Sequence, residues 1–140
     1  MNQEYKTVLY ELDEKGIARI TLNRPEAMNA MSTEVFKEML SLLGEVGYDD
    51  KVRVVIITGA GRAFCAGGDL AEMKAGYGGN HGFFQFMELV NRFTALLAEL
   101  PKPVIAAVNG AATGAGMNIA LASDIVIASK RQNSLKSLEM

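Results

Sequence analysis

The stretch "GRAFCAGGDL", residues 61–70, decides which fold this chain can adopt. It holds three glycines and follows the apolar run 52–57, whose continuous hydrophobicity is typical of a strand buried on both faces. A chain that leaves such a strand with so few side chains either turns where a Cβ atom would clash or lets a ligand approach the backbone. A second loop of small residues, 109–117, repeats the design between a predicted strand and a predicted helix.

Hydrophobic periodicity on both sides of this stretch predicts an α/β protein with parallel strands, because strands alternate with helices. Ser32 is a good helix N-cap, and Asp69 and Glu72 have the spacing of a capping box. Residues 76–82 are expected to form a flexible, glycine-rich insert, and Pro101 ends the helical stripe that follows. The expected elements are a hairpin of strands at 7–12 and 17–22, a helix from 32 to about 47, a buried strand at 52–58, a short helix from 69, a helix over 83–100, a buried strand at 103–108, a small-residue helix at 114–122 and a buried strand at 124–128.

The last residues of the chain differ from the rest. Residues 130–140 have no strong period and follow a predicted strand, where a further crossover would be expected. A parallel sheet needs cover on both of its faces. We therefore expect residues 1–129 to form the core of a fold that is cut short and residues 130–140 to form a tail that departs from it.

The composition excludes several classes of function. The 140 residues are 49% hydrophobic and carry 14 Lys+Arg against 16 Asp+Glu, which predicts one globular domain without a basic, nucleic-acid-binding surface. The single Cys65 cannot form an intramolecular disulfide or a zinc site alone, and it suits a reducing cytoplasm. The polar N-terminus and the lack of a run of about 20 apolar residues argue against a signal peptide and a membrane span. We expect a cytoplasmic protein with no metal and no membrane partner.

The two glycine-rich loops allow three readings. A phosphate-binding loop needs Gly-Lys-Ser/Thr, or a third glycine after Gly-x-Gly, and neither 59–64 nor 114–119 supplies it. A nucleotide-binding module is therefore disfavoured. The loops could instead present backbone N–H groups to an oxygen on which negative charge develops, or they could simply be tight turns packed under neighbouring helices.

Three segments closely resemble the crotonase superfamily, the enoyl-CoA hydratases and isomerases. They are "LNRPEAMNAM" (22–31), "GRAFCAGGDL" (61–70) and "KPVIAAVNGAATGAGMNIALASDIVIAS" (102–129). The resemblance extends from residue 5 to about residue 129 in the order and spacing of the family. It implies a crotonase-like (ClpP/crotonase) superhelix of repeated ββα turns. It also implies an acyl-CoA thioester as ligand and a family trimer or hexamer. No separate cofactor is implied, since coenzyme A is part of the substrate.

The resemblance also assigns candidate site residues. The N–H groups of Gly68 and Ala115 would hold the thioester oxygen, and the Ala66 backbone would face the adenine of CoA. The position three residues after the second donor carries a glutamate in the hydratases but is Asn118 here, and an amide cannot act as a base near pH 7. Asn at this position resembles the isomerases of phenylacetate-type degradation. The other residues expected to contact the substrate are Cys65, Gly67, Asp69, Leu70, Ala71 and Gly114.

Two function classes remain after the nucleotide module is set aside. One is an enzyme of the enoyl-CoA hydratase/isomerase kind that stabilises a thioester enolate. The other is a truncated fragment that binds CoA esters without turnover. Of the remaining polar residues, Arg24 is either a contact to a CoA phosphate or part of a solvated turn. His81 is expected in a surface loop, and Asp124 is expected to anchor the strand that follows it.

Overall fold

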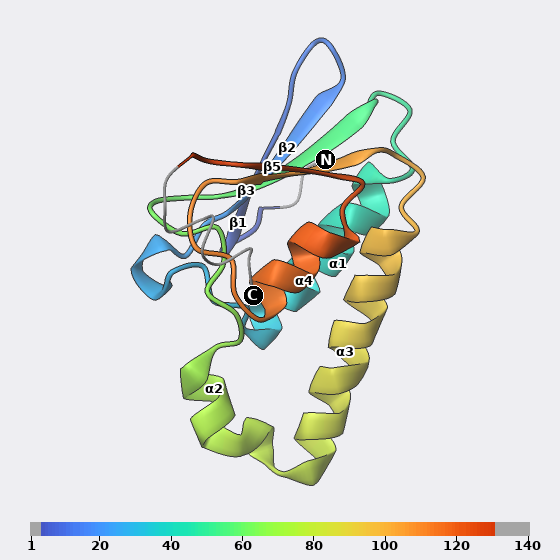
Figure 1. Cartoon of the computed structure of the whole chain (residues 1–140). Helices are drawn as coiled ribbons and strands as arrows, with labels where there is room; N and C mark the ends of the chain where they lie inside the picture. The colour runs from blue at the N-terminus through green and yellow to red at the C-terminus, as the bar shows by residue number, and fades with distance from the viewer. Residues whose placement is uncertain (1–3, 131–140) are drawn as a thin grey trace.

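A computed structural model describes residues 4–130 and shows a single mixed sheet with helices packed against it (Figure 1). Within these residues the sheet has five strands in the order β1-β2-β3-β4-β5. β1 pairs antiparallel with β2, while β2, β3, β4 and β5 pair in parallel, as predicted for an α/β protein. The strands are β1 (Val8–Leu12), β2 (Ile17–Leu22), β3 (Val54–Gly59), β4 (Val104–Val108) and β5 (Ile125–Ala128).

The helices connect the parallel strands and gather below the sheet in the view of Figure 1. α1 packs against α3, and α3 packs in turn against α4. The described helices are α1 (Thr33–Val46), α2 (Leu70–Ala75), α3 (Asn80–Ala98) and α4 (Ala115–Ala122), with 3-10 turns η1 (Pro25–Ala27) and η2 (Gly76–Gly78).

The chain makes a second, shorter set of parallel pairings after the strands. Met31, which follows β2, bridges to Gly68, which follows β3, and Cys65 bridges in the same way to Ala112, which follows β4. A strand, a short β bridge and a helix therefore recur along the chain. This is the repeated ββα turn that the resemblance implies.

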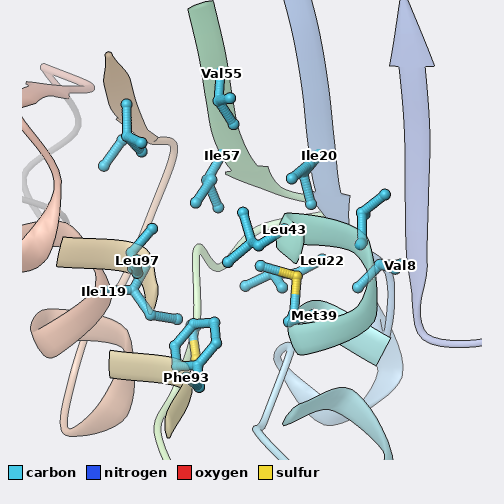
Figure 2. Packing of buried hydrophobic residues seen from close by; sticks show 14 of the residues in the cluster. Val8, Ile20, Leu22, Met39, Leu43, Val55, Ile57, Phe93, Leu97 and Ile119 are labelled. Carbon is cyan, nitrogen blue, oxygen red and sulfur yellow. The ribbon is translucent and has the colours of Figure 1, made fainter. Parts of the chain in front are cut away.

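The apolar stripe of α1 forms the centre of the core. Figure 2 shows Met39 and Leu43 of α1 between the strand residues and the side chains of Phe93 and Ile119 from α3 and α4. The helix begins where the sequence predicts, because the Ser32 hydroxyl accepts a hydrogen bond from the Val35 N–H at 3.3 Å.

The structure corrects two expectations from the sequence, one for residues 76–82 and one for the strand at 124–128. Residues 76–82, expected to form a flexible insert with His81 in a surface loop, instead contain η2 and the start of α3, so His81 lies in the first turn of a helix. The strand at 124–128 is not buried, because Ile125, Val126 and Ile127 are 52%, 40% and 59% exposed. β5 is the last strand of the sheet, and no described element covers these side chains.

The stripe of α3 is also only partly buried. Phe93 and Leu97 reach the core, whereas Phe83 and Met87, nearer its N-terminus, are exposed. The N-terminal half of this helix reaches beyond the sheet and packs against η2 rather than under the strands (Figure 1).

Leu43 and Leu121 form a matched pair for testing this core. Leu43 is fully buried, while Leu121 of α4 is 70% exposed. We expect Leu43→Ala to lower the free energy of unfolding by about 2–5 kcal/mol, because it removes buried methyl groups and leaves a cavity. Leu121→Ala should change it by no more than about 0.5 kcal/mol. Urea unfolding followed by circular dichroism measures both, and equal effects would contradict the placement of α1.

Candidate functional site

The loop after β3 is poor in side chains because backbone packs directly against backbone there. A Cβ atom on Gly59 would lie 2.5 Å from the Ala63 and Phe64 carbonyl oxygens. A Cβ on Gly110 would strike the Arg62 carbonyl, and one on Gly116 would strike the Cys65 carbonyl. These glycines allow the two small-residue loops, and α4 behind them, to lie against each other.

Two asparagines hold the loop from opposite sides, and neither was singled out from the sequence. The buried Asn29 amide donates to the carbonyl oxygens of Ala60 and Ala63, both at 2.9 Å. The Asn109 amide donates to Gly61 and Ala63 at 3.2 Å, and its oxygen accepts from the Gly59 N–H at 3.1 Å. Ala63 O is thus shared by both side chains. In the sequence, the only sign of this arrangement is that the turn after β2 and the turn after β4 each contain an asparagine.

The two loops meet next to the predicted oxyanion donors. A Cβ on Gly67, whose φ is +106°, would lie 3.2 Å from Thr113 O, and one on Gly114 would lie 3.5 Å from the Gly67 Cα. The Thr113 hydroxyl donates to Ala66 O at 2.9 Å and adds a side-chain link between the loops. Gly68 follows Gly67, and Ala115 follows Gly114. The Gly68 and Ala115 N–H groups therefore both lie next to the point where the two loops touch.

Neither of these N–H groups donates a hydrogen bond to another residue in the described part of the chain. Gly68 is exposed, and a Cβ there would meet only the flexible Met73 sulfur, at 3.4 Å. The fold therefore does not require glycine at position 68. A free donor and open space above the backbone are what an approaching ligand atom would need.

Asn118 lies one helical turn beyond Ala115, on the same side of α4. Both border a small apolar cavity of about 20 Å³ between α1, α3 and α4. The cavity is far smaller than an acyl chain. Its lining consists of Phe36, Val90, Phe93, Thr94, Leu97, Ala115, Asn118, Ile119 and Ala122.

The remaining predicted contact residues divide into exposed and buried groups. Ala66, Leu70, Ala71 and Gly114 are exposed around the two donors, with Leu70 at 68%. Gly67 is buried at the contact between the loops.

Cys65 lies in the core rather than on the predicted ligand path. Its side chain is fully buried, and its N–H and C=O bond to Ala111 O and Thr113 N–H. Burial raises the pKa of its thiol to about 11, which removes nucleophilic character at neutral pH. In this structure Cys65 supports the loop and offers nothing to a ligand.

Asp69 and Arg24 form an ion pair beside the first donor. Asp69 caps α2 by accepting from the Glu72 N–H at 3.0 Å, and Arg24 Nη1 lies 3.0 Å from its other oxygen. The same Nη1 donates to Ala30 O at 2.8 Å. Arg24 is therefore held by Asp69 and Ala30 and is not part of a solvated turn. The Glu72 N–H bond and, to a smaller extent, Arg24 hold the pKa of the Asp69 carboxyl below its usual value.

The capping box at 69–72 is only half formed. Asp69 accepts from the Glu72 N–H, but the Glu72 carboxylate accepts from the Thr33 N–H at 2.7 Å instead of from Asp69 N–H. The Asp69 N–H donates to Met31 O. Glu72 thus ties α2 to the start of α1. Asp124 behaves as predicted, since its carboxylate accepts from the Val104 N–H at 2.7 Å at the start of β4.

A larger cavity of about 620 Å³ lies between α1, α2, η2 and α3. Lys37, Glu72, Glu88 and Arg92 border it together with the ring of Tyr77, so its lining has no preference for one sign of charge. Neither candidate oxyanion donor borders it. Among residues 4–130, no group of three or more His, Cys, Asp or Glu is placed to hold a metal, and no helix could span a membrane.

The stacked ββα turns and the two touching glycine-rich loops define a protein of the crotonase fold. Solved structures bear this out. AtuE of Pseudomonas aeruginosa superimposes with a TM-score of 0.84 at 35% identity, over 89% of this chain and 48% of that one. An enoyl-CoA hydratase of Mycobacterium smegmatis gives a TM-score of 0.83 at 35% identity, over 88% and 48%.

Sequence comparison identifies the family. The family model described as enoyl-CoA hydratase/isomerase matches residues 13–137. The 1,2-epoxyphenylacetyl-CoA isomerase of Escherichia coli is 44% identical over 84% of this chain and 45% of its own length. The trans-2-decenoyl-[acyl-carrier-protein] isomerase of Streptococcus mutans is 36% identical over 96% and 51%. The chain belongs to the enoyl-CoA hydratase/isomerase family of enzymes, and it spans about half the length of the curated relatives it matches.

The lowered pKa of Asp69 predicts a pH-dependent contribution to stability. A carboxyl whose folded pKa lies below its unfolded value near 3.8 stabilises the fold fully above pH 3.8 and loses that contribution as the pH falls through the folded pKa. We expect Asp69→Asn, which keeps a capping oxygen, to cost on the order of 1 kcal/mol at neutral pH. The difference from the wild type should vanish in acid. Urea unfolding from pH 7 down to about pH 2 measures it, and a difference that grows in acid would refute the assignment.

Proposed function

We propose that the chain binds an acyl thioester of coenzyme A and polarises its carbonyl between the N–H groups of Gly68 and Ala115. The observation that supports this most directly is a pair of N–H groups, at the contact between two loops, that have no hydrogen-bond partner among residues 4–130. Backbone donors that converge on one oxygen stabilise the negative charge that develops there in an enolate or a tetrahedral intermediate. The family membership makes a thioester oxygen the natural occupant.

The two donors contribute through different local structures. Ala115 begins α4, so the partial positive charge of that helix N-terminus adds to its field. The Gly68 N–H belongs to a peptide group whose carbonyl, Gly67 O, accepts from the Met31 N–H at 2.7 Å. By comparison with other enzymes, the loss of one such donor costs about 2.7–4 kcal/mol of transition-state stabilisation.

The side chains beside the donors favour isomerisation over hydration. Hydration needs a carboxylate that activates water, and Asn118 stands at the position where the resemblance places one. The carboxylates next to Gly68 in the sequence, Asp69 and Glu72, are committed to Arg24 and Thr33. Two relatives are named isomerases, one of a CoA derivative and one of an acyl-carrier-protein derivative. Both carriers bind acyl groups as thioesters.

The 140-residue chain by itself is proposed to bind and polarise the thioester with little or no turnover. The two carboxylates that follow Gly68 in the sequence, Asp69 and Glu72, are held by Arg24 and the Thr33 N–H. The Asn118 amide can orient a water molecule or the substrate but cannot remove a proton near pH 7. An inactive CoA-ester-binding fragment is therefore the second candidate function.

Substitutions at Gly68 test the first donor. Gly68→Pro removes the N–H, and Gly68→Ala retains it with a Cβ that only Met73 approaches. We expect bound crotonyl-CoA to show a lowered carbonyl stretching frequency in Raman difference spectra with the wild type and Gly68→Ala. The shift should be largely lost with Gly68→Pro. A shift that survives in Gly68→Pro with intact binding would place the oxyanion hole elsewhere.

The substitution Asn118→Glu tests the preference for isomerisation. We expect the unmodified chain to hydrate crotonyl-CoA slowly or not at all, because it lacks a carboxylate at this position. Asn118→Glu should raise the rate, because it supplies a carboxylate that can activate water, while Asn118→Gln serves as the neutral control. The decrease in enoyl thioester absorbance measures the reaction. Rapid hydration by the unmodified chain would contradict the proposal.

We further propose that the chain self-associates through β5. This edge strand exposes Ile125, Val126 and Ile127, carries no charge, and pairs on one side only within the described residues. Open apolar strand edges promote association between chains. We expect Ile127→Lys to reduce the particle mass in light scattering. Tyr48→Lys, at a side chain 74% exposed beyond α1, should leave it unchanged. Equal behaviour of both variants would rule out β5 as the interface.

A further inference from the structure

An arginine stands at the beginning of a series of hydrogen bonds that ends at the Gly68 N–H. Arg24 Nη1 donates to Ala30 O at 2.8 Å. Ala30 O and the Met31 N–H belong to the same peptide group. The Met31 N–H donates to Gly67 O at 2.7 Å, and Gly67 O shares its peptide group with the Gly68 N–H.

The order of atoms in this series makes each bond strengthen the next. All peptide bonds described here are trans, so the C=O and the N–H of one peptide group point in opposite directions. A cation at the carbonyl end of the 30–31 peptide group increases the partial positive charge at its N–H end. That N–H in turn polarises the 67–68 peptide group toward a stronger Gly68 donor.

The surroundings favour transmission along this series. Met31 is fully buried, so the central hydrogen bond lies away from water, where electrostatic effects are larger. The side chain of Arg24 is 24% exposed, and Asp69 holds it in place through the same nitrogen that contacts Ala30. Further bonds tie the same turn to the loop, because the Ala66 N–H donates to Met28 O and the Asp69 N–H to Met31 O.

We infer that Arg24 is a positioning residue that orients and polarises the Gly68 N–H through the 30–31 and 67–68 peptide groups. This inference rests on the proposed function for its catalytic meaning, but the series of bonds exists without a ligand. The second donor differs. Gly114 O, in the peptide group of the Ala115 N–H, accepts from the Asn118 N–H at 3.1 Å inside α4, with no cation in line. Ala115 is therefore an internal control.

The first experiment needs no ligand and uses the isotope-labelled chain. In the wild type we expect a measurable scalar coupling across the hydrogen bond between Met31 N and the Gly67 carbonyl carbon. We also expect the Gly67 carbonyl carbon and Gly68 nitrogen signals to be shifted downfield. Arg24→Gln, which can still donate a hydrogen bond but carries no charge, should move both signals upfield and leave Ala115 in place. Arg24→Lys should retain most of the shift.

The control is Arg19→Gln, because Arg19 is exposed on β2 and its ion pair with Glu11, at 3.9 Å, is long and lies at the surface. It should change neither Gly67 nor Gly68. Unchanged signals in a folded Arg24→Gln variant would overturn the inference. Should Arg24→Gln fail to fold, an absent coupling in the wild type would still overturn the inference, because the series of bonds would not be formed.

The second experiment separates this inference from the proposed function. Crotonyl-CoA labelled with ¹³C at the thioester carbon is added to each variant, and its bound carbonyl signal is recorded. The proposed function predicts a downfield shift in the wild type, and the inference predicts that Arg24→Gln measurably reduces it while Arg24→Lys keeps most of it. A wild type that binds without a shift would refute the proposed oxyanion hole. A full shift in Arg24→Gln would refute only the role of Arg24.

Discussion

The carbonyl oxygen of Ala63 is the point on which the site depends. It accepts hydrogen bonds from the side chains of Asn29 and Asn109, which come from the turns after β2 and β4. These bonds draw three successive turns of the superhelix together at one backbone atom. The close packing at Gly59 and Gly110 leaves no room for side chains, so the loop after β3 has only one way to pass between its neighbours.

The close packing of the loop after β3 also explains why its exposed end, at Gly68, presents a backbone N–H group. Every polar backbone group of a buried loop must find a partner, and the carbonyl and amide groups from Ala60 to Ala66 largely find theirs within the two neighbouring turns. At Gly68 the loop reaches the surface, and the N–H group is left without a partner among residues 4–130. The proposed oxyanion hole rests on this donor, since donors that are fixed in advance spare electrostatic catalysis the cost of reorganisation.

In the proposed site, the groups that bind the thioester are separate from the group that would transfer a proton. The donors are backbone groups, so their position depends on the fold and only weakly on the side chain at the same residue. The acid/base group must be a side chain, and the carboxylates nearest to the donors have structural duties at the start of α1 and α2. The proposed site at Gly68 and Ala115 therefore lies next to two carboxylates, Asp69 and Glu72, that are already held by Arg24 and by backbone N–H groups.

The sequence by itself determined the class of fold, the order of the elements and the family. Hydrophobic periodicity and helix caps such as Ser32 depend on local spacing, and the three quoted segments carry the family pattern in contiguous residues. Tertiary structure decided what depends on distant contacts: that Asn29 and Asn109 share one carbonyl, that Arg24 joins Asp69 and Ala30, and that Glu72 caps α1 instead of its own helix. It also decided that Cys65 is buried and β5 exposed, because burial depends on which elements pack over a segment and not on the hydrophobicity of the segment alone.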